Sequence, residues 1–567
     1  MQRIDPKKLD LALVPAGTPM FADIIERIAH CPEMSATRKR DLVSGLTRVA
    51  KALNRAPAEV PADPKWLQPR LEKVMPAAIK LSEKSWQNAR SDARAALAWA
   101  GIVQRRHRAI EDLAPAWRAL WQRVLASKDQ SLSLALCRFT HFLNGLGVSP
   151  DDVMQTHADS YLHALEADEI SKAPRTAWRA AINAWNRATT RIEGWPQTRL
   201  AKPRRQKVYK RADEDLPADF VADLAALMQR MAAPDPFAED GPSRPLRPAS
   251  ITAYTRQLKR FASELLDAGV PAEEISGVAA LCDPERAELG MRAMYARNGN
   301  EKNRLMAETA ALLRNLARRL DLGEATRARL AKLAKNMAMP AQKGMTRKNR
   351  ERLRPLQDDK TYLKLLMLPE KLFARETGKT KPFPAALVRE DALAIALLLY
   401  CPLRIKNIAG IHLDRHLQHM GDGRVFLVMT EDDTKTGEHS EAELPGELVR
   451  MLKRHLATRT PLLCASGNPW LFPRRDGQGP VDPNHLSSRL KKRIRREVGI
   501  EMNAHLFRHL AAMIWLDARP GAYEAARRLL GHSASSHTIN LYSGLEARSA
   551  TNAFGQLLET RRKGPRK

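Results

Sequence analysis

Apolar residues recur at three- and four-residue intervals through most of this chain, and that spacing is typical of amphipathic helices. The pattern runs from residue 21 to about residue 188, and glycine stands just past the apparent ends of the helices expected there. It returns at 250–270 and 303–320. With 44% hydrophobic residues there is enough apolar material for packed cores. The sequence therefore predicts a mainly α fold and excludes a wholly disordered chain.

Strand-like texture is confined to one stretch near the C-terminal end. The segment GRVFLVMT at 423–430 is rich in β-forming residues and opens from a Gly-Asp-Gly turn. The segment 438–445 alternates as an edge strand does, and helical spacing resumes at 446–457. We expect a small antiparallel β-sheet inside a mostly helical C-terminal domain.

Changes of composition divide the chain into blocks. Six of the ten residues in KPRRQKVYKR (202–211) are basic, and a second basic stretch lies near 341–355. The first stretch reads equally well as a solvated linker or as a strap along a phosphate backbone. We expect an N-terminal helical module, a basic and Pro-rich linker, a second helical module, a basic linker and a C-terminal domain, at 1–200, 201–248, 249–340, 341–355 and 356–567 respectively.

The charge balance predicts a polyanionic partner. The chain has 94 Lys and Arg against 64 Asp and Glu, a formal net charge of +30, and basic residues that neutralise phosphates release condensed counterions. A membrane surface is the alternative, but the longest apolar run, at 392–400, is far shorter than the roughly 18 residues of a spanning helix. Five scattered cysteines and the lack of a signal-peptide core favour a reducing compartment. We expect a protein of a reducing compartment that binds a polyphosphate and no membrane.

Two motifs resemble cofactor sites but lack essential parts. Residues 378–380 (Gly-Lys-Thr) look like the end of a phosphate-binding loop, yet the first glycine of that motif is missing and prolines follow. His505 and His509 stand four apart, as metal ligands do on a helix, but Arg508 lies between them and a carboxylate does not. We therefore expect neither a metal nor a nucleotide cofactor.

Six polar residues in the last third of the chain carry the chemical signal, although each has an ordinary structural explanation when taken alone. An arginine follows a buried helix in PLRIKNIAGI, where it costs free energy unless it meets an anion or a core carboxylate. A lysine stands in a turn between strand-like runs, a His-x-x-Arg pair opens a helix, a histidine follows Leu-Leu-Gly, and a tyrosine lies ten residues further on. In chain order these residues are Arg404, Lys435, His505, Arg508, His532 and Tyr542.

The order of these residues resembles the signature of the tyrosine recombinase (phage integrase) family. The stretches PLRIKNIAGI, TKTG, HLFRH and LLGH and the last tyrosine match motif by motif, over roughly residues 355–560. The resemblance implies two phosphate-binding arginines, a lysine on a strand hairpin, two histidines and a tyrosine nucleophile, which are Arg404 and Arg508, Lys435, His505 and His532, and Tyr542.

This chain departs from the family pattern at two places. Asn407 stands three residues after the first arginine, where the family often has glutamate. Tyr542 follows His532 by ten residues, where nine is common in the family. Tyr523 is a poorer candidate for the nucleophile, because it precedes the Gly-His pair and reads as part of a helix.

The residue types suit phosphoryl transfer without a metal. Two guanidiniums are bidentate donors to the non-bridging oxygens, on which negative charge develops. A tyrosine, with its ordinary pKa near 10, needs nearby positive charge and a proton acceptor such as His505, and Lys435 is a reasonable acid for the leaving 5′ oxygen. The 3′-phosphotyrosine bond would keep the energy of the phosphodiester, so resealing needs no ATP.

The resemblance therefore implies a site-specific DNA recombinase, the integrase of a mobile element or phage, in the cytoplasm and associated with the nucleoid. It would act on double-stranded DNA as a homo-tetramer, with 249–340 as a second, core-binding-like DNA-binding module and with accessory DNA-bending or directionality proteins. A type IB topoisomerase-like nicking-closing enzyme and a catalytically inactive DNA-binding relative are the alternatives. The basic run RLKKRIRR (489–496) is expected to lie against the DNA backbone. The C-terminal tail either packs on its own domain or docks into a neighbouring subunit through an apolar face of Ala553, Phe554, Leu557 and Leu558.

Overall fold

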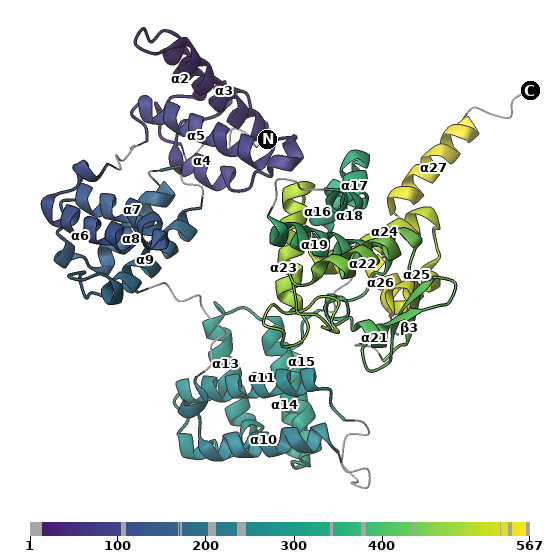
Figure 1. Cartoon of the computed structure of the whole chain (residues 1–567). Helices are drawn as coiled ribbons and strands as arrows, with labels where there is room; N and C mark the ends of the chain where they lie inside the picture. The colour runs from purple at the N-terminus through teal and green to yellow at the C-terminus, as the bar shows by residue number, and fades with distance from the viewer. Residues whose placement is uncertain are drawn as a thin grey trace, which may run out of the picture. The chain divides into compact units, whose positions relative to one another are not determined.

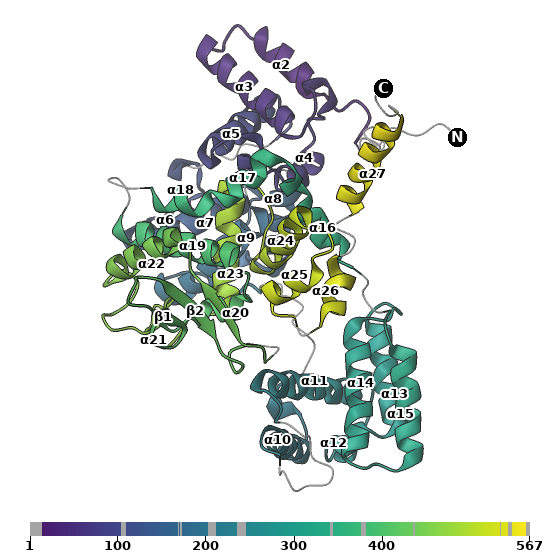
Figure 2. The same ribbon diagram turned by 90° about the vertical axis from the view of Figure 1, so that its right-hand side faces the viewer.

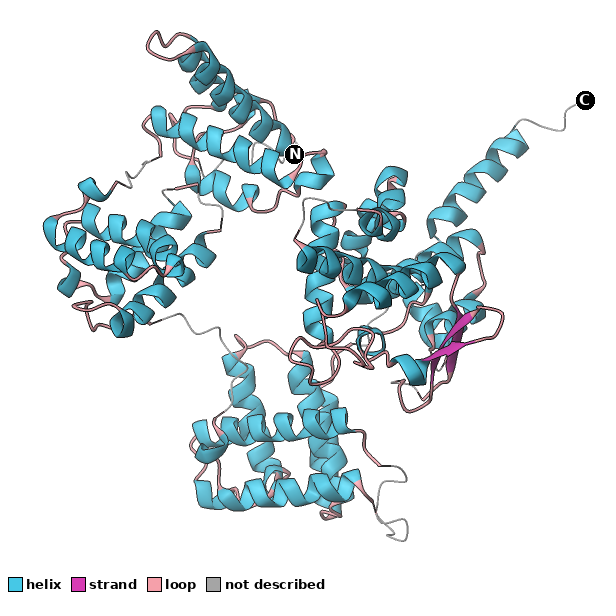
Figure 3. Ribbon diagram, viewed as in Figure 1, coloured by secondary structure: helices cyan, strands magenta, loops and turns pink. Residues whose placement is uncertain are grey.

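Helices dominate the computed structural model of the chain, as predicted, and the only sheet among the described residues is small (Figures 1 and 3). None of the described helices is long and apolar enough to cross a lipid bilayer. The chain forms two compact units, one of residues 1–202 with 343–567 and one of residues 203–342. The structure describes residues 14–103, 109–167, 169–170, 173–201, 211–234, 245–340, 344–375, 381–434, 437–532, 534–542 and 547–562.

The first 200 residues hold two separate hydrophobic cores. In the first core, Gly45 of one helix lies so close to another that a Cβ there would stand 2.6 Å from the Cβ of Asp92. The second core is aromatic, with Trp185 in edge contact with Trp117 and Trp195. The helices of the first core are α2 (Phe21–Ala29), α3 (Ala36–Ala52), α4 (Pro64–Leu71) and α5 (Glu83–Trp99), and those of the second are α6 (Pro115–Ala126), α7 (Gln130–Gly145), α8 (Gln155–Ala167) and α9 (Pro174–Arg191).

The unit at 203–342 is a helical bundle with its own core (Figure 2). Its first helix lies inside the segment 201–248, which the sequence predicted as a linker. The helix was not predicted because its short apolar stripe, which includes Phe220 and Leu224, is flanked by basic and Pro-rich sequence. Gly290 packs against the ring of Phe261, where a Cβ would lie 2.6 Å from a ring carbon. The helices are α10 (Ala218–Ala232), α11 (Pro248–Asp267), α12 (Val278–Leu281), α13 (Pro284–Arg297), α14 (Arg304–Arg319) and α15 (Glu324–Met337).

The C-terminal domain is built around α19 (Pro382–Tyr400), which is buried without a break from Glu390 to Leu398. The continuous apolar text of this helix explains its central place, because a helix that is hydrophobic all round must be covered on every side. The other helices are α16 (Arg347–Leu353), α17 (Asp359–Leu366), α18 (Leu368–Phe373), α20 (Ile405–Ala409), α21 (Leu413–His416), α22 (Gly446–Arg459), α23 (Pro483–Glu497), α24 (Ala504–Ala518), α25 (Tyr523–Leu530), α26 (Ser535–Tyr542) and α27 (Ala547–Arg562).

The predicted antiparallel sheet is present and has three strands in the order β1-β2-β3, drawn in magenta in Figure 3. The strands are β1 (Leu417–His419), β2 (Val425–Met429) and β3 (Ser440–Glu443). Leu427 of the central strand pairs with Leu417 and Ala442. The turn between β2 and β3 is the one in which the sequence places Lys435.

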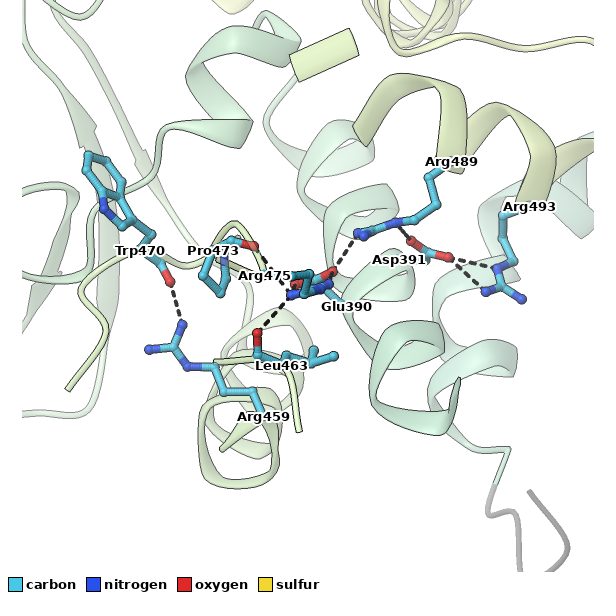
Figure 4. Close-up of polar contacts among 9 residues, drawn as sticks. All are labelled: Glu390, Asp391, Arg459, Leu463, Trp470, Pro473, Arg475, Arg489 and Arg493. Carbon is cyan, nitrogen blue, oxygen red and sulfur yellow. Dashed lines mark hydrogen bonds and ion pairs between the residues drawn. The ribbon is translucent and has the colours of Figure 1, made fainter. Parts of the chain in front are cut away.

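A buried ionic cluster joins α19 to α23 and to the loop before α23 (Figure 4). Glu390 and Asp391 are 1% and 0% exposed. Arg475 and Arg489 each donate to Glu390 at 2.6 Å, and Arg493 donates to Asp391 at 2.8 Å. Arg489 also donates to Asp391. We call these five residues the ionic cluster.

The ionic cluster corrects one expectation about the basic run at 489–496. Arg489 and Arg493 are largely buried and their guanidiniums bind the carboxylates of α19, so these two side chains are not available to a phosphate backbone. Other basic side chains of the run form ion pairs with carboxylates close in sequence: Lys491 and Arg495 with Glu501, and Arg496 with Glu497. Most basic side chains of the run are therefore paired with carboxylates of the fold. These carboxylates lie outside the run itself.

Candidate active site

Helix α24 carries three polar side chains on one face. Its N-cap Asn503 accepts a hydrogen bond from the backbone N–H of Leu506, which fixes where the helix begins. His505, Arg508 and His509 then follow at helical spacing of three and four residues, so their side chains share a face.

Arg508 ties together three segments that are distant in the sequence. It is 4% exposed, and its Nη1 donates to the carbonyl oxygen of Pro402 at 2.7 Å while its Nη2 donates to the carbonyl oxygen of Leu530. Pro402 stands two residues before Arg404, and Leu530 two residues before His532. Since two carbonyls offer no net negative charge, Arg508 organises the site and remains a cation with no carboxylate partner among the residues that the structure describes.

The electrostatics of Arg508 reflect this placement. Burial and the neighbouring cation Arg404 lower its pKa to about 10, and Tyr542 opposes that shift. Arg508 is therefore still charged at neutral pH. The influence of Arg404 on the pKa of Arg508 means that the two guanidiniums lie within electrostatic reach of each other.

Arg404 is the N-cap residue of the short helix α20 and is half-buried. Within the described part of the chain its guanidinium makes no hydrogen bond and no ion pair, and burial lowers its pKa. A partly desolvated cation without a carboxylate is favourable only where an anion arrives. The two arginines therefore form a candidate anion site.

His505 is exposed at the start of α24. Loss of solvent around the ring lowers its pKa, and the cations Arg508 and Arg404 lower it further. The neutral ring is thus favoured at physiological pH, and a neutral imidazole has a nitrogen lone pair that accepts a proton.

Tyr542 is the last residue of α26 and is 1% exposed. Its Oη lies 3.0 Å from Nδ1 of His509, and its ring is parallel to that of His532 at a centroid distance of 6.4 Å. Burial raises the pKa of Tyr542 to about 12, although Arg508 opposes the shift. The phenol is therefore neutral and covered.

His532 follows α25 and is 7% exposed. Its Nδ1 lies 2.9 Å from the hydroxyl of Thr538 on α26. The backbone oxygen of His532 accepts a hydrogen bond from Arg527 at 2.7 Å. Both contacts fix the turn that joins α25 to α26, so they also fix the start of the helix that ends in Tyr542.

Lys435 lies outside the described residues, but its neighbour Asp433 does not. Asn407 of α20 donates from Nδ2 to the backbone oxygen of Asp433 at 3.2 Å. The carboxylate of Asp433 accepts hydrogen bonds from Thr430 and lies 3.3 Å from Nε2 of His416. The position where the family often has glutamate therefore anchors the turn that leads to Lys435.

Five of the six residues predicted from the sequence are described, and the structure brings them together around Arg508: Arg404, His505, Arg508, His532 and Tyr542. Sequence reasoning missed His509, which it considered only as a metal ligand. Its spacing from His505, on the same helix face, was the available signal. Among the described residues no group of three or more His, Cys, Asp or Glu is arranged to hold a metal ion.

Comparison with known proteins identifies the same region. Residues 379–548 match the model of the phage integrase family, and all six predicted site residues lie within that segment. A comparison with curated proteins finds no significant match.

Several solved structures are similar to this chain. The crystal structure of XerA recombinase is 14% identical, with 61% of this chain and 99% of that chain covered, at a TM-score of 0.24. XerH site-specific recombinase bound to palindromic difH substrate is 13% identical, with 61% and 98% covered, at a TM-score of 0.34. The Tn1549 transposon integrase in complex with circular intermediate DNA is 14% identical, with 59% and 99% covered, at a TM-score of 0.33.

Proposed function

Because residues 379–548 are a phage integrase (tyrosine recombinase) domain, we propose that the protein is a site-specific DNA recombinase that cleaves and rejoins strands through a 3′-phosphotyrosine intermediate. The observation that carries the proposal is a pair of arginines, Arg404 and Arg508, that have no carboxylate partner among the described residues, with Arg508 within electrostatic reach of the phenol of Tyr542. This arrangement favours a phosphate as the missing anion.

In the proposed reaction the arginines hold the scissile phosphate. Arg508 uses two of its five N–H donors on backbone carbonyls, and Arg404 uses none on the described residues. Charge that develops on the non-bridging oxygens is then stabilised by cations already in place, at no cost of reorganisation. His532 adds a further donor to the phosphate.

The proton balance assigns a role to each remaining group. The phenol of Tyr542 loses its proton to neutral His505, its oxygen bonds to phosphorus, and the bond from phosphorus to the 5′ oxygen breaks. Lys435 protonates that leaving oxygen. Attack of a second 5′ hydroxyl reverses these steps and releases the tyrosine, so that neither a metal ion nor ATP takes part.

Cleavage requires a rearrangement of Tyr542. At 1% exposure its oxygen is not accessible to a phosphodiester. The C-terminal end of α26 must therefore move away from α24 when DNA binds. The resting structure then protects the nucleophile, and the site becomes competent only on its substrate.

The rest of the chain supplies the DNA clamp in this proposal. The helical modules before residue 341 and the basic linkers bind duplex DNA and neutralise its phosphates. On α27 the side chains of Phe554, Leu557 and Leu558 are 59%, 50% and 40% exposed. We assign this apolar face to a neighbouring subunit of a tetramer on DNA, and the biological role to a mobile element or phage.

A nicked suicide substrate tests the proposal. Duplexes that flank the gene, together with a pool of randomised duplexes, are nicked so that the cleaved end diffuses away and the covalent adduct accumulates. The wild-type protein is expected to form an adduct that resists denaturation, and Tyr542→Phe to form none. An adduct that persists in Tyr542→Phe would place the nucleophile elsewhere.

The same material separates the alternatives. Efficient relaxation of supercoiled plasmid without any selected site would favour a type IB topoisomerase-like enzyme. DNA binding without any adduct, in the wild-type protein and at every selected sequence, would favour an inactive DNA-binding relative.

A further inference from the structure

A chain of side-chain contacts runs from α16 through α24 to the end of α26. Nδ2 of Asn349 lies 3.3 Å from Nε2 of His509, and Nδ1 of His509 lies 3.0 Å from Oη of Tyr542. His509 is 3% exposed, so bulk water does not compete for these bonds.

Asn349 decides where the proton of His509 resides. An amide nitrogen only donates hydrogen bonds, so Nε2 of His509 must accept. Burial and the neighbouring His505 and Arg508 lower the pKa of His509 to about 4, so the ring is neutral at physiological pH and has one N–H. That N–H is therefore on Nδ1, and it donates to the oxygen of Tyr542.

The segment that bears Asn349 also contacts the helix of the phenol. Gly344 has φ +70° and lies against α26, where a Cβ built on it would be 3.9 Å from the backbone oxygen of Asn540. Met345 is 4% exposed and belongs to the core of the C-terminal domain. The start of this domain thus packs beside both helices, α24 and α26, that carry the candidate site.

We propose that His509 is a positioning residue for Tyr542, whose Nδ1–H holds the phenol oxygen, and that Asn349 fixes the tautomer that makes this possible. The inference rests on the proposed role of Tyr542 as nucleophile. A donor at the phenol oxygen leaves the phenol proton to another acceptor, which is His505, and it stabilises the phenolate as that proton departs.

Two isosteres at residue 509 separate this role from simple packing. The side-chain amide of His509→Asn places a donor near the position of Nδ1, whereas that of His509→Gln places it near Nε2. Both are neutral amides. If residue 509 supplied only bulk or polarity, His509→Asn would not be expected to cleave DNA faster than His509→Gln.

The pKa of the phenol is measured without DNA. The full-length protein is labelled with 3-fluorotyrosine at its eight tyrosines, and the ¹⁹F resonance that disappears in Tyr542→Phe belongs to residue 542. We expect the pKa of that phenol to be higher in His509→Gln than in the wild type, because the donor to the phenol oxygen is lost, with His509→Asn close to the wild type. The other titratable or charged groups around the phenol are common to all three proteins: Arg404, His505, Arg508 and His532.

Cleavage of the suicide substrate supplies the second readout. Adduct formation is expected to fall about tenfold in His509→Gln and to stay within about threefold of the wild type in His509→Asn, with DNA binding unchanged. Asn349→Leu, at a partly exposed position, removes the contact from Asn349 to His509 without a change in the core, and is expected to lower the cleavage rate severalfold. His485→Gln, at an exposed histidine of α23, is the matched control and keeps the wild-type rate.

The outcomes are distinct. Equal pKa values of the phenol, or equal cleavage rates, in His509→Asn and His509→Gln would overturn the positioning role, and so would a wild-type rate in Asn349→Leu. An adduct that survives in Tyr542→Phe would instead overturn the proposed function, while the ¹⁹F titration would still report on the bond between His509 and Tyr542.

Discussion

The C-terminal domain contains two arginine-rich regions with opposite electrostatic balance. In the ionic cluster three arginines meet the buried carboxylates of Glu390 and Asp391. In the described part of the candidate site, Arg508 donates only to backbone carbonyls and Arg404 has no hydrogen-bond or ion-pair partner. The first region is complete without a ligand, whereas the second is left with net positive charge.

The number of arginines in a region therefore does not identify a phosphate site. A guanidinium with a carboxylate partner is neutralised within the fold, and a guanidinium with carbonyl partners is oriented but stays available to an anion. The identity of the acceptor, and not the number of arginines, distinguishes structural from functional cations. Removal of a carboxylate from the ionic cluster tests the structural side of this distinction, and removal of an arginine from the candidate site tests the functional side.

The largest effect is expected on stability when a carboxylate of the ionic cluster is removed. Asp391→Ala leaves Arg489 and Arg493 largely buried without their partner, and breaking such a buried pair costs about 3–5 kcal/mol. Urea unfolding of the full-length protein, followed by circular dichroism, measures the loss. Asp422→Ala, which breaks an exposed pair with Arg424, is the control and is expected to leave the stability close to that of the wild type, because solvent screens such a pair.

The complementary change in the candidate site is expected to spare the fold and remove the chemistry. Arg404→Ala eliminates a half-buried cation with no partner in the described chain, so the stability of the protein should not fall. Cleavage of the suicide substrate should fall by about 10²–10³ while DNA binding is retained, since the lost interaction acts on charge that develops during attack. A loss of DNA binding as large as the loss of cleavage would contradict that assignment.

Much of the fold was predictable from the sequence because it depends on local periodicity. The helical spacing and the short β-rich stretch at 423–430 predicted a mainly helical protein with a small antiparallel sheet, and the structure confirms both. Helix α10 was not predicted, because its apolar stripe is short and lies within basic and Pro-rich text. The division of the first 200 residues into two cores depends on long-range packing, which periodicity does not report.

The candidate site was predictable in its residue types but not in its internal bonds. The family signature predicted that Arg404, Arg508 and Tyr542 lie together, yet the phenol oxygen contacts His509, to which the signature gave no role in the site. The expectation that the basic run at 489–496 lies against DNA also overlooked contacts between residues distant in the sequence. The carboxylates that neutralise two of its arginines are about a hundred residues away on α19, as Arg489 and Asp391 show.

Each region also holds a buried neutral histidine, and this predicts how stability depends on pH. Burial, Arg459 and other nearby cations lower the pKa of His455 to about 3, and burial with His505 and Arg508 lowers that of His509 to about 4. The unfolded chain takes up these protons near pH 6.5 and the folded protein does not, so stability should fall as the pH drops below 6.5.

The size of this acid effect is about 2 kcal/mol per histidine between pH 6.5 and pH 5. Urea unfolding at pH 7 and pH 5 measures it for the wild type, for His455→Gln and for His509→Asn. Each variant lacks one titrating group and should lose about 2 kcal/mol less than the wild type on acidification. The same acid loss in all three proteins would mean that neither ring is held neutral by the fold.

The smallest effect is expected where the site again uses a backbone carbonyl as acceptor. Asn407 donates to the backbone oxygen of Asp433, two residues before Lys435. Asn407→Asp keeps the shape but removes the donor, and one lost hydrogen bond costs about 1 kcal/mol, or roughly fivefold in the cleavage rate. Glutamate, common in the family at this position, only accepts hydrogen bonds when ionised, and here it would face a carbonyl oxygen. The cleavage rate of Asn407→Glu should therefore be no higher than that of Asn407→Asp. Single-turnover cleavage with DNA binding held saturating measures both variants, and a wild-type rate in Asn407→Asp would show that the turn before Lys435 needs no anchor on α20.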